Sequence, residues 1–182
     1  MGFKIGQKVI YPNHGIGTIE QIEQKQFGVS SLSYYTLRLL STDTIVLVPV
    51  SNAEEVGLRS PITTAECEML IKCLADDFET CPLDWKDRFR EFSERMRSGD
   101  IFEVADVLKR LTHLSHTKPL SFREQRIYER AKYMIVSEFA VVCHCSEEDV
   151  LVRIDQALAR ACTKHDRKIL RIQTAAGASI GH

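Results

Sequence analysis

FKIGQKVIYPNHGIGTIEQIE, the stretch from Phe3 to Glu23, decides the fold of the amino-terminal third of this chain. Branched apolar residues precede and follow a short turn that contains Pro12, Gly15 and Gly17. Proline presets one backbone angle of such a turn, and glycine allows the positive φ angles that a sharp reversal needs. The stretch therefore predicts a strand, a tight turn and a second strand.

A second stretch, IVLVPVSNAEEVGLR from Ile45 to Arg59, is also rich in branched residues, which favour strands. Together with the aromatic run at 34–40 it extends the β pattern to residue 58. The expected strands cover 8–11, 17–26, 33–40 and 44–49, with a short fifth strand near 55–58. Five short strands in so few residues indicate a small SH3-like or Tudor-like β-barrel.

The chain changes character at Ser60-Pro61, because the residue before a proline is pushed out of the helical region. Beyond this point the apolar residues follow helical periodicity. Five helix starts carry an N-cap residue or a capping box: Thr63-x-x-Glu66, Asp84, Asp100-x-x-Glu103, Ser121-x-x-Glu124 and Ser146. We therefore predict an α+β protein, with the barrel at 1–60, a compact all-α domain of about five helices at 61–165, and a flexible tail at 166–182.

The composition is that of an ordinary soluble protein, with 44% hydrophobic and 27% charged residues. No apolar run approaches the ~20 residues of a membrane helix, and the amino terminus lacks a signal-peptide pattern. We expect a cytoplasmic protein without a membrane partner.

The net charge of −1 argues against a nucleic-acid partner, but the distribution of charge along the chain does not. Residues 61–85 hold one base and six acids, whereas residues 86–132 hold twelve bases and eight acids. Segregation of this kind can create a basic face, although solvated helices with mixed charges are the alternative.

The six cysteines suggest reduced packing residues and no disulfide framework in this compartment. Cys143 and Cys145 with Cys162 and His165 are a conceivable zinc set, but the predicted helix separates the two pairs by roughly 20 Å. We expect no metal and no cofactor.

Catalytic motifs are absent from the sequence. A histidine in a tight turn, such as His14, is more typical of a hydrogen bond within its own loop. The sequence favours a protein that is not an enzyme.

The two quoted stretches resemble the RNA-polymerase-interacting domain of the CarD/CdnL family of bacterial transcription regulators, which the transcription-repair coupling factor also carries. The carboxyl half is similar to the same family at Asp84-Trp85-Lys86, at Ser98-Gly99-Asp100 and at Pro119-Leu120-Ser121-x-x-Glu124. The resemblance runs from Phe3 to Leu158 and so covers both predicted domains. It implies a global regulator that binds polymerase.

The resemblance implies that the barrel docks on the β subunit of RNA polymerase by strand-to-strand contact. It places this contact at Lys25 and at a strand that contains Ile45, Val46, Leu47, Val48 and Pro49. Many relatives carry an arginine where this chain has Leu47, so a bidentate partner for a carboxylate is missing here. An open barrel also has a free strand edge, which can accept a partner strand. Plain strand packing is the alternative for Ile45, Leu47 and Pro49.

A second candidate surface is Trp85, the single tryptophan, with the cations Lys86, Arg88 and Arg90 directly after it. An aromatic ring among cations suits insertion at a distorted base step of DNA while the cations hold phosphates. The resemblance implies that this tryptophan is a wedge at the upstream edge of the melted promoter. The alternative is a core residue, because Trp85 has helical spacing to Phe89, Phe92 and Met96.

We expect a transcription regulator that binds the polymerase β subunit and stabilises the promoter open complex through upstream DNA contact that is not sequence-specific. No small-molecule ligand is implied. One alternative is an adaptor whose helical domain binds another protein. Another is a KOW-like RNA-binding module, against which the five bases and five acids of residues 1–60 argue.

Overall fold

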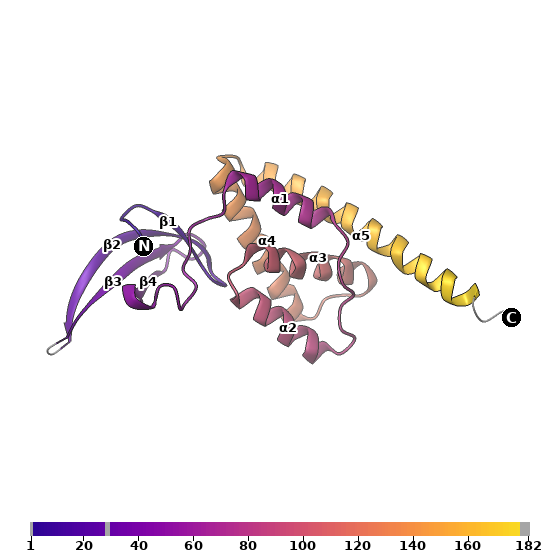
Figure 1. The fold of residues 1–182 in the computed structure, drawn as a ribbon, viewed down its shortest axis with the longest axis horizontal. Helices are drawn as coiled ribbons and strands as arrows, with labels where there is room; N and C mark the ends of the chain where they lie inside the picture. Colours follow the sequence, from indigo (N-terminus) through magenta and orange to yellow (C-terminus); the bar gives the residue numbers. More distant parts are fainter. Residues whose placement is uncertain (1, 28–29, 179–182) are drawn as a thin grey trace.

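The computed structural model describes residues 2–27 and 30–178 and contains a curled antiparallel sheet followed by five α-helices (Figure 1). The four strands are β1 (Lys8–Tyr11), β2 (Gly15–Phe27), β3 (Ser30–Leu39) and β4 (Ile45–Pro49). They pair in the order β1-β2-β3-β4, each antiparallel to its neighbour. The predicted α+β class is confirmed, and the sheet of four strands curls into a half-barrel.

The tight turn between β1 and β2 forms where the sequence predicts it. Gly15 has a φ of 85°, and a Cβ atom built on it would lie 3.3 Å from the ring of Tyr133. Glycine is therefore required here both for the backbone angle and for the close approach of α4 (Phe122–Cys143). The register of β2 against β3 shifts between Ile19 and Gln21, which is a β-bulge and helps the long hairpin to curl.

The fifth strand, predicted near residues 55–58, is absent from the described chain. After β4 the backbone forms a short 3-10 helix, η1 (Val50–Asn52), and then turns through Gly57, which has a φ of 77°. Only Arg59 reaches the sheet, through a single bridge to Ile10 with backbone N···O distances of 2.7 and 3.2 Å. A strand fails here because the chain makes local turn hydrogen bonds, such as the one from the Leu58 N–H to the Ala53 carbonyl.

All five predicted helices are confirmed: α1 (Thr64–Ala75), α2 (Trp85–Arg97), α3 (Ile101–Thr117), α4 and α5 (Glu147–Ala178). Thr63 and Ser121 form complete capping boxes, and Asp84 and Asp100 accept hydrogen bonds from the first free amides of their helices. The segment from residue 166, which we expected to be a flexible tail, continues as helix to Ala178. Residues 179–182 lie outside the described residues.

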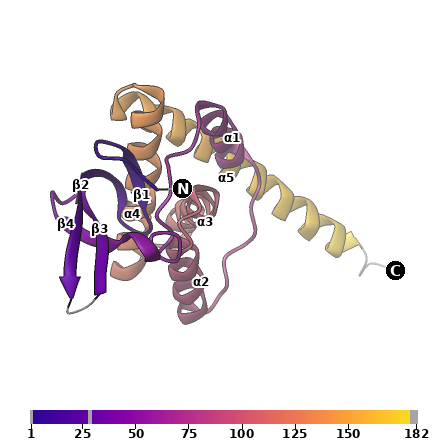
Figure 2. The ribbon, with the colours of Figure 1, turned by 60° about the vertical axis from the view of Figure 1, so that its left-hand side comes forward.

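The two domains have separate hydrophobic cores and meet at the β1–β2 turn. The core of the helical domain is built from all five helices, and the core of the sheet is built from side chains of all four strands together with Ala53 and Leu58. Gly57 and Gly99 both face the ring of Pro12, and a Cβ atom on either would lie within 3.0 Å of it. This close approach leaves the sheet at one end of the helical domain, while α5 extends away from the other end (Figures 1 and 2).

Candidate functional site

The strand register decides which side chains of β4 face outward. Leu47 pairs with Thr36 and Ile45 pairs with Arg38, and residues that oppose each other across a ladder share a face. Leu47 is 45% exposed and Ile45 is 51% exposed, whereas Val48 is 2% exposed. Alternate residues of β4 therefore point to solvent and to the core.

This alternation divides the residues expected to contact polymerase. Val48 belongs to the core of the sheet, and Val46 packs against the same core, so neither side chain is available to a partner on the open face. Ile45, Leu47 and Pro49 are the residues of β4 on the opposite side. The sequence could not settle this point, because a run of five apolar residues has no alternating polar marker.

Lys25 lies on the same side of the sheet as the exposed residues of β4, although it is on β2. Lys25 pairs with Leu32 of β3. Two residues along on the same face, Glu23 pairs with Tyr34, and Tyr34 pairs with Pro49 of β4. The Lys25 Nζ lies 3.7 Å from a carboxylate oxygen of Glu23. We name this surface the outer face and define it by Lys25, Leu32, Ile45, Leu47 and Pro49.

The β4 strand also forms one end of the sheet within the described residues. The backbone N–H and C=O groups on its outer side therefore have no neighbouring strand there. An edge strand of this kind can accept a partner's strand, with backbone hydrogen bonds for affinity and side-chain contacts for specificity. The free edge and the exposed Leu47 meet on the same strand.

Trp85 is the first residue of α2 and is 51% exposed. The Asp84 carboxylate caps this helix by accepting hydrogen bonds from the backbone N–H groups of Lys86 and Asp87 at 2.8 and 3.3 Å. The Lys86 ammonium lies 5.8 Å from the centre of the indole, within the range of a cation–π contact. The side chain lies outside the helical core, in which Phe92 is fully buried.

Arg88 is buried, whereas a contact with phosphate requires an exposed side chain. It is 3% exposed, and its guanidinium donates to the Glu124 carboxylate at 3.1 Å and to the carbonyls of Pro82 and Leu83 at 2.7 and 2.6 Å. All of these partners belong to the protein itself. Arg88 therefore leaves the set of residues expected to bind DNA and acts as a clamp on the segment before Trp85.

The Arg88–Glu124 pair remains ionised for a clear physical reason. Burial alone would raise the pKa of Glu124, but hydrogen bonds from Ser121 and Arg88 lower it below its ordinary value. Glu124 also closes the capping box of α4, since its carboxylate accepts the Ser121 N–H at 2.8 Å. One carboxylate thus joins the start of α4 to the start of α2.

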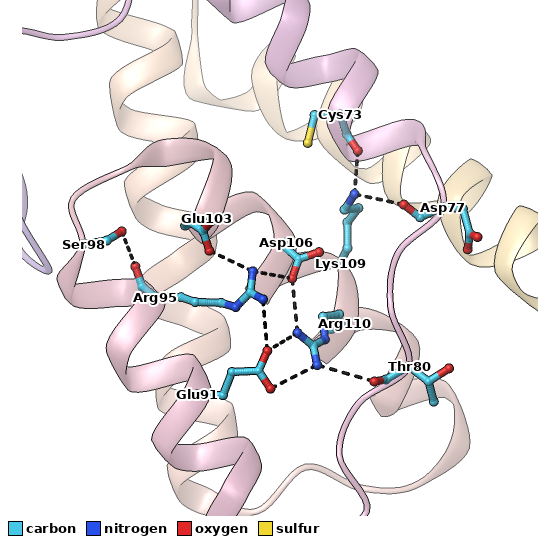
Figure 3. A network of polar contacts seen from close by, with 10 residues as sticks. All are labelled: Cys73, Asp77, Thr80, Glu91, Arg95, Ser98, Glu103, Asp106, Lys109 and Arg110. Atoms are coloured by element: carbon cyan, nitrogen blue, oxygen red, sulfur yellow. Dashed lines mark hydrogen bonds and ion pairs between the residues drawn. The ribbon is translucent and has the colours of Figure 1, made fainter.

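The rest of the segment before Trp85, residues 76–84, is held by a second polar network (Figure 3). The Lys109 ammonium donates to the Cys73 carbonyl at 2.8 Å and reaches the Asp77 carbonyl at 3.5 Å. Arg110, which is 2% exposed, forms an ion pair with Glu91 and contacts the Thr80 carbonyl at 3.5 Å. Together with Arg88, these contacts tie the segment to the helical domain at several backbone carbonyls before Trp85.

The remaining predicted cations lie at the surface. Lys86 is exposed, and the Arg90 side chain is 72% exposed, with its guanidinium 3.0 Å from the Asp87 carboxylate. Exposed pairs of this kind are weak and exchange readily with another anion. Leu83, two residues before Trp85, is an apolar side chain that is 97% exposed.

A hollow of about 420 Å³ between α2 and α4 is a feature that the sequence analysis missed. Four arginines line it together with apolar and polar residues of both helices and of the β1–β2 turn; the full lining is Asn13, Phe89, Ser93, Met96, Arg97, Arg123, Arg126, Ile127 and Arg130. The Arg123 guanidinium lies 5.4 Å from the centre of the Phe89 ring. We name this hollow the arginine groove.

The signal for the arginine groove was present in the sequence. Arg123, Arg126 and Arg130 have the spacing i, i+3, i+7, which places them on one face of a helix. Among the described residues, none of these three guanidinium groups forms an ion pair; Arg130 donates to the Asn13 side chain at 3.2 Å. The positive charge of α4 is therefore available to an external anion.

Other kinds of site are not formed by the described residues. They contain no group of three or more His, Cys, Asp or Glu side chains that could hold a metal ion, and their six cysteines are free thiols. No helix in this part of the chain combines the length and the apolar character that a membrane span requires.

Comparison with known proteins matches both parts of the chain. Residues 3–62 match the family model described as the CarD-like/TRCF RID domain, and residues 69–155 match the model described as the CarD C-terminal domain. The chain is also similar to a protein of Bacillus subtilis (strain 168) named "Putative transcription factor YdeB". The two are 26% identical over 148 residues, which cover 81% of this chain and 97% of the relative.

Proposed function

Because this chain belongs to the CarD-like family of transcription factors, we propose that it binds the β subunit of RNA polymerase through its sheet and stabilises the promoter open complex through its helical domain. The family makes the chain a transcription regulator. We propose three further points: which polymerase subunit the chain binds, that it contacts DNA, and that it acts on the open complex.

The outer face and the free edge of β4 support polymerase binding. Ile45 and Leu47 are about half exposed on an edge strand, where solvent-exposed apolar residues are a liability unless a partner covers them. A strand of the partner would add to β4 and cover both side chains. Lys25 lies on the same face and supplies a positive charge toward an acidic group of the partner.

The single observation that carries the DNA proposal is the exposure of Trp85 at the end of a segment whose backbone carbonyls are hydrogen-bonded to buried arginines. The indole is 51% exposed, although the residues around it are fixed by Arg88 and Arg110. A half-exposed aromatic ring suits stacking on a base, which is worth about 1–3 kcal/mol per base. The cations Lys86 and Arg90 would contact phosphates beside it.

The arginine groove supports the same proposal. Its four arginines lie on the helical domain between α2 and α4, and α2 begins at Trp85. Contacts from arginine to phosphate position a protein on DNA but do not select a sequence. We therefore expect action at many promoters.

The proposed mechanism is a shift in population. A protein that binds opened promoter DNA more tightly than closed DNA favours the open complex by the ratio of the two affinities. Trp85 supplies this difference because an indole stacks on an unpaired or distorted step better than on an intact one. Phosphate contacts, in contrast, are nearly equal in the two states and mainly raise affinity.

A footprint of the polymerase–promoter complex, with and without the full-length protein, tests the proposal. We expect new protection of DNA at the upstream edge of the melted region and a longer open-complex lifetime. If the protein binds polymerase and leaves both the footprint and the lifetime unchanged, the DNA proposal is wrong, and an adaptor that binds another protein becomes the better hypothesis.

A further inference from the structure

The second half of α5 is not covered by the family comparison. The match to the CarD C-terminal domain ends at residue 155, whereas the helix continues to Ala178. From Gln156 onward the sequence holds five bases and one acid, a net charge of +4. Beyond the core of the domain this part of the helix is exposed and projects from the body (Figures 1 and 2).

Two of these five basic residues form ion pairs within the protein. The Lys164 ammonium lies 2.9 Å from the Asp76 carboxylate, and the Lys168 ammonium lies 2.6 Å from the Asp77 carboxylate. These pairs join α5 to the residues that follow α1. Lys164 and Lys168 therefore serve the fold.

The other three bases, Arg160, Arg167 and Arg171, are exposed, and their guanidinium groups form no ion pair with the described residues. At 100° per residue they fall within about 40° of one another around the helix axis, and they extend over about 17 Å along it. They form a straight stripe of unpaired positive charge, which we name the α5 stripe.

The helix macrodipole does not explain the α5 stripe. Cations stabilise a helix when they lie in its last turn, but the last turn of α5 contains no basic residue. Arg171 lies seven positions before Ala178, which is about two turns from the end. The three arginines therefore have no role in the fold that the structure accounts for.

The helix that carries the α5 stripe also contacts the segment before Trp85. His165 of α5 is 3.5 Å from the Thr80 hydroxyl, and Trp85 follows Thr80 by five residues, which span at most about 18 Å. Around the helix axis the α5 stripe is about 140° from His165, so its arginines face solvent beside this contact.

We propose that Arg160, Arg167 and Arg171 form a second contact to the phosphate backbone of double-stranded promoter DNA, on the duplex next to the step that Trp85 enters. This inference rests on the proposed DNA contact of Trp85 and adds a partner surface that the family match does not include. The stripe binds phosphates on the duplex, so it reads no sequence and raises affinity for open and closed promoters alike.

The test uses the full-length protein with polymerase and promoter DNA, and measures how its affinity for this complex depends on salt. The variant is R160Q/R167Q/R171Q, since glutamine keeps the helix and removes the charge. Loss of three phosphate contacts should reduce the slope of log affinity against log salt by about 2.7, at 0.9 for each contact. The charge-retaining variant R160K/R167K/R171K should keep most of the slope.

A matched control replaces three exposed lysines outside α5, Lys4, Lys72 and Lys118, with glutamine. It changes the net charge by the same amount and should leave the slope close to that of the unaltered protein. If the control lowers the slope as much as the α5 variant does, the effect is one of net charge and the proposal is overturned.

A third variant, Arg123→Gln with Arg126→Gln in the arginine groove, separates the two proposals. A reduced slope in the groove variant with an unchanged slope in the α5 variant overturns the α5 stripe and leaves the DNA contact of the helical domain in place. Unchanged slopes in both overturn the DNA contact itself. Light scattering on the free protein adds one outcome: if the α5 variant changes the molecular mass and leaves the slope unchanged, the stripe binds a second copy of the chain and the proposal is wrong.

Discussion

Arg59 and Glu138 join the two domains through a bidentate ion pair. The two carboxylate oxygens of Glu138 accept hydrogen bonds from the Arg59 guanidinium at 2.7 and 3.0 Å, and one of them also accepts the Ile62 N–H at 2.9 Å. The backbone of Arg59 pairs at the same time with Ile10 of β1. Glu138 is 2% exposed, so a single buried carboxylate holds the linker between the sheet and the helical domain.

Removal of one partner of this pair should destabilise the protein strongly. Arg59→Met leaves the Glu138 charge buried without its partner, which costs about 3–5 kcal/mol of the free energy of unfolding. Urea denaturation followed by circular dichroism measures this loss. Glu68→Gln is the matched control, because the Arg153–Glu68 pair is exposed and contributes less than about 1 kcal/mol. A loss for Arg59→Met as small as that of the control would contradict the linker role.

Leu47→Asp should weaken polymerase binding without unfolding the sheet. Leu47 is 45% exposed on the edge strand, so the charge costs little in the free protein and opposes the covering of this face by a partner. Capture of polymerase by the immobilised full-length variant measures the effect, for which we expect a loss of at least about tenfold in affinity.

Two controls accompany that measurement. Leu40→Asp changes another leucine, 49% exposed and outside β4, and should leave polymerase capture unchanged. Val48→Asp places a charge in the core of the sheet and should unfold it, with a lowered melting temperature. Normal capture by a folded Leu47→Asp protein would remove the outer face from the proposed contact.

Trp85→Ala should shorten the open-complex lifetime while the protein stays folded. Because half of the side chain is already exposed, its truncation should cost less than about 2 kcal/mol. Phe92→Ala is the control for a core aromatic of the same helix, and it should cost about 3–5 kcal/mol. A thermal melt beside the lifetime assay distinguishes the two. An unaltered lifetime with Trp85→Ala would end the role of the indole as a wedge.

Arg88→Lys should move the indole even though the positive charge is kept. Lysine cannot donate simultaneously to Glu124 and to the carbonyls of Pro82 and Leu83 in the fork geometry of arginine. Trp85 is the single tryptophan, so its fluorescence emission and its quenching by iodide report the change directly. We expect altered quenching and a reduced effect on open complexes. Identical spectra would show that the clamp does not position Trp85.

The stability of the helical domain should fall in acid through Glu124. Its pKa is lowered in the folded protein from the ordinary value of 4.5, so its contribution is complete above that value and is lost as the pH falls toward the folded pKa. Urea denaturation at a series of pH values from about 6 to about 3, which spans the ordinary pKa, measures this loss of the free energy of unfolding. Glu124→Gln should be less stable at neutral pH and should lose less on acidification. Equal pH dependence of the two proteins would contradict this assignment.

The sequence by itself determined most of the element types and the starts of the helices. The capping boxes at Thr63 and Ser121 and the turn at Gly15 are each specified by residues a few positions apart, so their signals survive without tertiary structure. There were two exceptions. Turn hydrogen bonds between near neighbours replaced the expected fifth strand, and residues 166–178 continue α5 where a flexible tail was expected.

Only the tertiary structure decided which side chains a partner can reach. Arg88 follows Trp85 by three residues and looked like a surface cation, but its partner Glu124 lies 36 residues away and draws it into the interior. Val48 and Leu47 are neighbours in sequence, but the pleat of the strand points Val48 to the core and Leu47 to solvent. The partners of Arg59 and the lining of the arginine groove likewise come from distant segments. Burial and ion pairing depend on which surfaces pack together, and local residue patterns do not contain that information.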